Sequence, residues 1–150
     1  MDVPEISRFR ENIRHIEREL NIQNNSHCSQ GVTLAQCHTL LELFSDDNIS
    51  LSELSDRLYL DKSTVSRTIE GLVKSDMVLR NIPDENRRKV IISLTPKGSD
   101  LCKQINIEND NYFSDVLDSI PQIDRPVFLK SFEKIVHKMI QYNKEKKKLC

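Results

Sequence analysis

Two short clusters in the N-terminal half combine side chains that bind soft metals or perform thiol chemistry. Cys37 is followed by His38, and His27 is followed by Cys28. Thiolate and imidazole groups are suitable ligands for zinc. A thiolate with a lowered pKa is also a nucleophile and a target of oxidants. The sequence therefore offers three candidate chemistries at Cys28, Cys37 and His38: metal binding, thiol oxidation and nucleophilic catalysis.

Catalysis is the least supported of the three. Consecutive residues on a helix point about 100° apart, so the side chains of Cys37 and His38 do not face each other. No third orienting group and no Gly-rich loop accompany them, and we expect neither an enzyme nor a bound cofactor. The alternative is packing, with Cys37 as a small buried hydrophobic residue and His38 on a helix surface.

The cysteines and the composition of residues 1–20 indicate where in the cell the protein works. The four cysteines are expected to be free thiols of a cytoplasmic protein, and they are Cys28, Cys37, Cys102 and Cys150. Cys28, in a polar segment beside His27, is the better candidate for a redox switch. Residues 1–20 are charged throughout and do not resemble a signal peptide, and no apolar run approaches the ~20 residues of a membrane helix.

Positive charge is concentrated in one segment of a chain whose net charge is only −1. Between Asp61 and Gly98 there are eight lysines or arginines and five acidic residues. A local basic segment inside a nearly neutral protein is typical of nucleic-acid binding. We therefore looked for an element in this segment that could enter a DNA groove.

Two short helices are predicted on either side of a three-residue link. Ser50 and Glu53 form an S-x-x-E capping box that opens a helix to Leu58, and Asp61 caps a second helix over about 62–75. The inward positions of the second helix are Val65, Ile69 and Leu72. A link this short forces a steep crossing, which is the helix-turn-helix geometry.

The outward residues of the 62–75 helix and the following hairpin are the candidate DNA contacts. Residues 77–82 and 89–95 are rich in Val and Ile and predict two strands joined by a basic turn, a wing. Arg67 is expected to read a guanine, and the free N–H groups of the first helical turn are expected to favour phosphate. The predicted DNA-binding residues are Lys62, Ser63, Thr64, Ser66, Arg67, Arg87, Arg88 and Lys89.

Long amphipathic helices are predicted on both sides of this region. Apolar residues recur at spacings of three and four over about 4–23 and 123–143, and a helix beginning at Thr95-Pro96 is expected to continue to about 119. A polar loop is expected at 21–30, a helix at 34–45, and a frayed basic tail at 144–148. The stripes on the terminal helices are too apolar for lone exposed helices, which indicates dimerisation.

Residues 33–98, taken with these helices, resemble the MarR family of winged helix-turn-helix regulators. The resemblance lies in "VTLAQCHTLLEL", "ISLSELSDRLYLDKSTVSRTIEGLVKSDMVLR" and "NIPDENRRKVIISLTPKG". It implies a mainly α fold with a small β-hairpin wing, and an obligate homodimer bound to a pseudopalindromic DNA site. It also implies that the first and the last two helices of each subunit interleave.

The chain departs from the family pattern at several positions. Asp76 stands where the family usually has Gly, and Asp can adopt the left-handed conformation that this turn needs. Tyr59 replaces a small turn residue, Gly71 a frequent basic residue, and Asn86 a wing Asp. Cys28 and His38 correspond to ligands of zinc-sensing members, whereas the histidine pair of those members is not reproduced.

We therefore predict one domain over residues 1–150, with a DNA-binding winged helix at about 33–96 and dimerisation helices at about 4–23 and 97–143. The expected function is sequence-specific regulation of transcription by a homodimeric repressor that responds to a small-molecule effector, a thiol event or a metal. The expected partners are double-stranded DNA and a second copy of the chain, with no membrane. The alternative is a winged-helix module for protein interaction without an operator.

Overall fold

The protein is mainly helical, with one small antiparallel sheet, as the sequence predicts. The computed structural model describes residues 3–27, 31–85 and 89–149. Contacts divide the chain into two units, Met1–Asn106 and Ile107–Cys150. No helix in the described ranges is both long and apolar enough to cross a bilayer.

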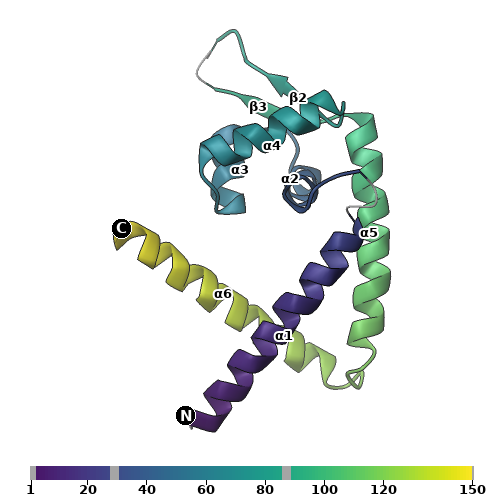
Figure 1. Ribbon diagram of the computed structural model, residues 1–150, viewed down its shortest axis with the longest axis vertical. Helices are drawn as coiled ribbons and strands as arrows, with labels where there is room; N and C mark the ends of the chain where they lie inside the picture. The colour runs from purple at the N-terminus through teal and green to yellow at the C-terminus, as the bar shows by residue number, and fades with distance from the viewer. Residues whose placement is uncertain (1–2, 28–30, 86–88, 150) are drawn as a thin grey trace. The chain divides into compact units, whose positions relative to one another are not determined.

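The first unit begins with α1 (Val3–His27) and α2 (Leu34–Ser45), followed by the two helices of the helix-turn-helix (Figure 1). These are α3 (Leu51–Leu58) and α4 (Lys62–Lys74). The polar loop predicted from residue 21 is wrong as far as His27, because α1 continues through it. Asn, Gln and Ser are only moderately unfavourable in helices, and no Gly or Pro interrupts this stretch.

Side-chain caps define the starts of the three central helices. Thr33 and Gln36 form a reciprocal capping box at α2, and Ser50 and Glu53 form the predicted one at α3. Asp61 caps α4 by accepting a hydrogen bond from the backbone N–H of Thr64. Each cap satisfies a backbone donor that would otherwise lack a partner, and so fixes the residue at which the helix begins.

The sheet has three strands in the order β1-β3-β2, all antiparallel. The hairpin strands β2 (Val78–Asn81) and β3 (Ile91–Leu94) confirm the predicted wing, with Val78 opposite Leu94 and Arg80 opposite Ile92. A third strand, β1 (Ile49–Ser50), was not predicted. Two residues are too few to show an alternation of apolar and polar positions, so the sequence carried no signal for it.

One apolar core joins the helices and the sheet of the first unit. The inward residues predicted for α4, Val65, Ile69 and Leu72, are all fully buried. They pack in one cluster with residues of α2, α3, the sheet and the helix that follows it from Pro96. The buried members of this cluster include Leu40, Leu43, Leu54, Val78, Ile92, Cys102 and Ile105. The core therefore fixes which face of α4 is turned outward.

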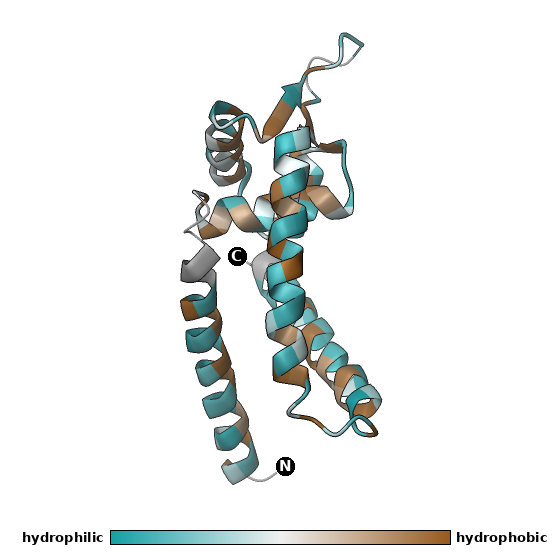
Figure 2. Cartoon of the chain, turned by 90° about the vertical axis from the view of Figure 1, so that its right-hand side faces the viewer, coloured by the Kyte–Doolittle hydropathy of each residue, from teal (hydrophilic) through white to brown (hydrophobic). Residues whose placement is uncertain are grey.

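α5 (Pro96–Leu117) starts at the predicted proline and continues from the first unit into the second. The second unit also contains α6 (Arg125–Leu149), in which the predicted frayed tail is helical. Lys and Glu are good helix formers, and the Lys146 ammonium lies over the Tyr142 ring one turn earlier, at 5.1 Å. Figure 2 shows apolar residues recurring along α1 and the C-terminal helices.

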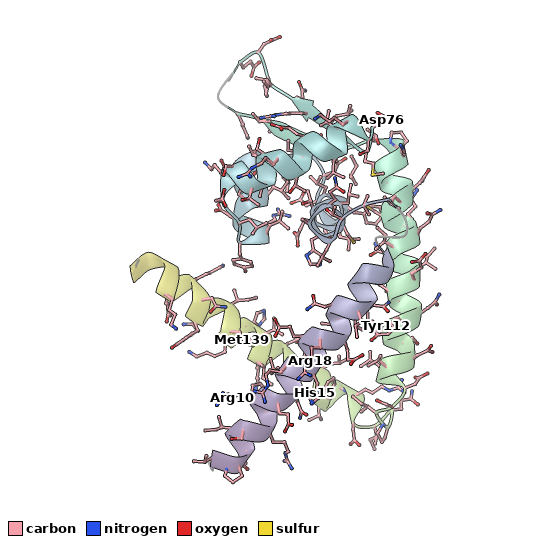
Figure 3. The ribbon with its side chains drawn as sticks, viewed as in Figure 1. Arg10, His15, Arg18, Asp76, Tyr112 and Met139 are labelled. Atoms are coloured by element: carbon pink, nitrogen blue, oxygen red, sulfur yellow. The ribbon has the colours of Figure 1, made fainter. Side chains whose placement is uncertain are left out.

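The junction between α4, the wing and α5 depends on two close backbone approaches. Asp76, labelled in Figure 3 at the turn after α4, has φ of 59°, which confirms the predicted left-handed turn. Its carbonyl accepts a hydrogen bond from the Thr95 hydroxyl, at 2.7 Å. At Gly98, a Cβ atom would lie 2.1 Å from the Met77 carbonyl oxygen. That oxygen already accepts a hydrogen bond from the N–H of Thr95.

We predict that Gly98→Ala strongly destabilises the protein. The methyl group would meet a hydrogen-bonded backbone oxygen that can move only if β2 and α5 separate, so the gain in helix propensity cannot offset the clash. We expect a loss of about 1–3 kcal/mol or more in the free energy of unfolding, measured by urea denaturation.

Gly71→Ala provides the matched control. There, the added Cβ would meet only the Nε2 atom of Gln36, at 2.8 Å, at the end of a flexible side chain. Since Ala favours helix over Gly by up to ~1 kcal/mol, we expect Gly71→Ala to stay within about 1 kcal/mol of the parent. Equal losses in the two variants would contradict the close approach at Gly98.

Candidate nucleic-acid interface

The turn between α3 and α4 is held by backbone hydrogen bonds and one left-handed residue. Tyr59 ends α3 with φ of 55°, and the Leu60 N–H donates to the Ser55 carbonyl oxygen at 3.1 Å. A bulky residue rarely adopts this conformation, and Tyr59 is thus unusual for this turn in its backbone as well as in its size. Asp61 then returns to extended backbone and starts α4.

α4 has one apolar and one polar face, and only the polar face is exposed. Lys62, Ser63, Arg67 and Glu70 are exposed, whereas Thr64 and Ser66 are partly covered. Ser63, Arg67 and Glu70 follow one another at helical spacings of four and three, so they form a single ridge. The structure therefore brings all five predicted contacts on this helix to or beside one surface.

The Asp61 carboxylate organises the first turn of α4. It accepts hydrogen bonds from the Ser63 hydroxyl at 2.5 Å, the Thr64 hydroxyl at 2.7 Å and the Thr64 N–H at 2.9 Å. Those donors hold the pKa of the Asp61 carboxyl far below its usual range. The carboxylate thus stays ionised and bonded at the helix N-terminus, where a negative charge is favourable.

The start of β3 lies close to the start of α3, where the Leu51 N–H donates to the Val90 carbonyl oxygen at 3.0 Å. Hydrogen bonds from the Ser50 side chain and backbone lower the pKa of Glu53, and the positive charges of Lys89 and Arg57 lower it further. Lys89 is exposed and lies just before β3, near the start of α3, where its charge acts on Glu53. Arg87 and Arg88, predicted for the wing tip, lie outside the described residues.

Asp47, which was not predicted as a structural residue, links the wing to the loop between α2 and β1. Asp47 accepts hydrogen bonds from the Leu94 N–H of β3, at 3.0 Å, and from its neighbour Asn48, at 2.9 Å. Next to it, Asp46 pairs with Arg57 of α3 at 2.6 Å. Neither link has a local sequence signal, because the bonded partners are separated by 47 and 11 positions.

Gly71 allows α2 to approach α4 closely. The Gln36 side chain, whose oxygen accepts from the Thr33 N–H in the capping box, passes within 2.8 Å of where a Gly71 Cβ would lie. A larger residue would press on this amide. Because the amide ends a flexible side chain, it can give way to a small group such as an Ala methyl.

The thiol and imidazole candidates do not converge in the described part of the chain. Cys37 is buried and His38 is exposed, which is the packing arrangement considered above. Cys102 is also buried, and its Sγ donates to the Leu40 carbonyl oxygen at 3.4 Å. Burial, and secondarily the nearby Cys37, raises the pKa of the Cys102 thiol to about 11, so this thiol is protonated and unreactive at neutral pH.

No cluster of three or more potential metal ligands occurs within residues 3–27, 31–85 and 89–149. Cys28, the better redox candidate, lies outside these ranges. Sensing by Cys28, Cys37 or His38 therefore stays a prediction.

One segment of the chain matches a known protein family. The family model described as MarR family matches residues 32–90, the segment that contains α2, the helix-turn-helix and β2. Through this segment, the chain is similar to the MarR family. The helix-turn-helix and wing resemblance predicted from the sequence is thus confirmed.

The relatives agree with the MarR assignment. The chain is 26% identical over 135 residues to the HTH-type transcriptional regulator YsmB of Bacillus subtilis, an alignment that covers 89% of this chain and 92% of YsmB. Among solved structures, a MarR family protein from Bacillus stearothermophilus is similar with a TM-score of 0.82 at 20% identity, over 93% of this chain and 99% of that one.

A third similar structure is the complex of S. aureus MepR with DNA. Its TM-score is 0.75 at 19% identity, and the similarity covers 87% of this chain and 98% of that chain. At this level of identity the likeness shows a shared fold. It supports a mainly α, winged helix-turn-helix architecture for this chain.

We predict that Asp61→Asn makes stability less dependent on acid pH. Because the pKa of Asp61 is depressed in the folded state, its stabilising effect is complete well above the unfolded pKa of about 3.9 and is lost as pH falls below it. The urea midpoint of the variant should therefore be lower than that of the parent at pH 7, and the difference should shrink between about pH 4 and pH 2.

Asp110→Asn, which neutralises an exposed aspartate of α5, is the matched control and should change the midpoint little at either pH. A difference between Asp61→Asn and the parent that persists unchanged at pH 2 would argue against the ionised cap.

Proposed function

We propose that the chain is a transcriptional regulator that binds DNA as a homodimer, with α4 in the major groove and the wing beside it. A single observation carries the proposal. The buried face of α4 turns an unbroken ridge of Ser63, Arg67 and Glu70 outward. An α-helix fits the major groove, where such side chains reach base edges.

Arg67 is the residue on this ridge best suited to read a base. No hydrogen bond or ion pair joins its guanidinium to another residue in the described part of the chain. A free guanidinium can donate two parallel hydrogen bonds to O6 and N7 of guanine, the commonest specific contact of this kind. Lys62, Ser66 and Lys89, with Arg87 and Arg88 of the wing, complete the proposed contacts.

The proposed dimer rests on the apolar side chains exposed in both units. On α6, Phe128 and Phe132 stack with ring centroids 5.7 Å apart and both remain exposed. Other exposed apolar residues follow along α1 and α6, among them Ile6, Phe9, Ile16, Leu129, Val136, Met139 and Tyr142. Apolar side chains exposed together on a monomer usually mark an interaction surface. A two-fold dimer would recognise a pseudopalindromic site with half-sites about one helical turn apart.

Regulation follows from the geometry of such a dimer. Two α4 helices engage successive grooves only at one spacing, so any effector that binds better to a different spacing weakens DNA binding. We propose that the protein is a repressor released in this way by a small molecule, a thiol event or a metal. MepR has been crystallised with DNA, which supports DNA as the partner of this fold.

The first test is selection of binding sites. The purified protein is incubated with a randomised library of double-stranded oligonucleotides, and the enriched duplexes are measured by fluorescence anisotropy at several salt concentrations. We expect a pseudopalindromic sequence whose affinity falls as salt rises. Failure to enrich any sequence would favour a winged-helix module that binds proteins instead.

We predict that Arg67→Ala costs about 1–3 kcal/mol on the selected operator and relaxes the preference at one base pair of each half-site. Lys103→Ala removes an exposed charge of α5 that pairs only with Asp100 among the described residues, and it should leave operator affinity nearly unchanged. Equal losses for Arg67→Ala on the operator and on an unrelated duplex would refute base reading.

We predict that Phe132→Asp converts the protein to a monomer and reduces operator affinity, because a charge would replace an aromatic ring at the proposed interface. Sedimentation equilibrium at micromolar concentration gives the association state, and circular dichroism verifies that the helices remain. Lys130→Ala, at an exposed polar position of the same helix, should stay dimeric. A variant Phe132→Asp that remains a dimer would place the interface elsewhere.

A further inference from the structure

The first turn of α4 presents hydroxyl groups whose hydrogen atoms are already used. A serine or threonine hydroxyl has one hydrogen to donate and two lone pairs that can accept. The Ser63 and Thr64 hydroxyls both donate to the Asp61 carboxylate, at 2.5 and 2.7 Å. Ser63 is exposed and Thr64 is partly covered, and what their hydroxyls can still offer to a partner are lone pairs.

This polarity is hard to reverse. A hydrogen bond from a hydroxyl to an ionised carboxylate is stronger than one between neutral groups, and the low pKa of Asp61 keeps the carboxylate ionised at any pH at which the protein would work. To donate elsewhere, a hydroxyl would have to give up this bond and leave the carboxylate with one donor fewer.

Polarity of this kind discriminates between the groups that DNA exposes. Phosphate oxygens only accept hydrogen bonds, and one placed here would also lie beside the negative charge of Asp61. In the major groove the available donors are the exocyclic amines, N6 of adenine and N4 of cytosine. The hydroxyls of the first turn therefore match a base amine and oppose a phosphate, while the expectation that the free N–H groups of this turn favour phosphate stays a prediction.

We propose that Ser63 and Thr64 are specificity-determining acceptors that select a base pair presenting an exocyclic amine, and that Asp61 is the positioning residue that fixes their polarity. This inference rests on the proposed function, because it requires α4 to lie in the major groove. Arg67, one turn further along the same face, offers donors only. The ridge would thus read an amine and a guanine in a fixed order along the strand.

The experiment uses the full-length protein and the duplex recovered by the selection described above. At each adenine and cytosine of a half-site, the base is replaced by its analogue without the amine, purine for adenine and 2-pyrimidinone for cytosine. In separate duplexes, each adenine is replaced by 7-deazaadenine, which keeps the amine and removes the N7 acceptor. Binding of each duplex is measured for the parent protein and for Ser63→Ala and Thr64→Val.

We expect loss of one particular amine to weaken binding of the parent about 5- to 30-fold, the effect of leaving one polar group unpaired. Ser63→Ala or Thr64→Val should bind the native and amine-free duplexes equally, because the contact is already absent. The 7-deazaadenine duplex at that position should bind the parent normally. Which analogue has the effect distinguishes adenine from cytosine.

Asp61→Asn tests the positioning role by a readout other than stability. The Asn side-chain oxygen can still accept the capping hydrogen bond from the Thr64 N–H, but one hydroxyl loses its acceptor and becomes free to donate. The ratio of affinities for native and amine-free duplexes should therefore fall toward one. Circular dichroism and the urea midpoint verify that the variant is folded at the assay temperature.

Two results would overturn the inference while leaving the proposed function intact. One is a parent protein that loses affinity with 7-deazaadenine but not with any amine-free base, since that would mean the hydroxyls donate. The other is an equal loss for Ser63→Ala on operator and unrelated duplexes, as expected of a phosphate contact. A selection that enriches no sequence at all would instead overturn the proposed function, and the inference with it.

Discussion

Burial of one face of α4 is the constraint on which the rest of the DNA-binding region depends. Val65, Ile69 and Leu72 are fully inside a core built jointly by α2, α3, α5 and the sheet. Burying side chains of this size stabilises by ~1.5–3 kcal/mol each, so rotating α4 about its axis would cost several of these contributions together. The rotation of the helix is thereby fixed, and with it the direction of every polar residue between the buried ones.

Close packing around α4 then leaves little freedom in its position. Gly71 lets the Gln36 amide of α2 pass over one side of the helix. At the other end, Asp76 turns the chain in a left-handed conformation, and its carbonyl is held by Thr95 at the start of α5. Gly98 brings the first turn of α5 against the Met77 carbonyl. Because these are contacts between backbones or with a capping side chain, a shift of α4 would also disturb α2, the wing and α5. Such coupling suits an element whose placement decides binding.

Much of this could be predicted from the sequence because its signals are local. The Ser50–Glu53 box and the Asp61 cap fixed the starts of α3 and α4 through side chains that bond within three residues, and helical spacing identified the buried face. Asp76 could be assigned a left-handed turn because it stands where the resembled family usually has Gly, and Asp tolerates that conformation. Two features that were not predicted depend on residues far apart in the sequence. β1 and the bond from Leu94 to Asp47 depend on pairing between distant segments, which no local pattern encodes. The loop predicted from residue 21 was wrong as far as His27, because polar composition is weak evidence against a helix where no Gly or Pro interrupts it.

The buried thiols and the Asp61 cap show how the same chemistry changes with its surroundings. Cys102 lies in an apolar core that disfavours charge, so its pKa is raised to about 11 and it serves packing. Asp61 lies at an exposed helix start with three donors, so its carboxylate is stabilised and fixes the polarity of two hydroxyls. Residue type alone does not decide which of the two can act on a partner, because their neighbours set the ionisation state of each. In this fold the acidic residue at the head of a basic helix does not weaken a DNA-binding face. Under the binding mode proposed above, it would make the hydroxyls of the first turn distinguish donors from acceptors, and discrimination of that kind is what sequence-specific binding requires beyond positive charge.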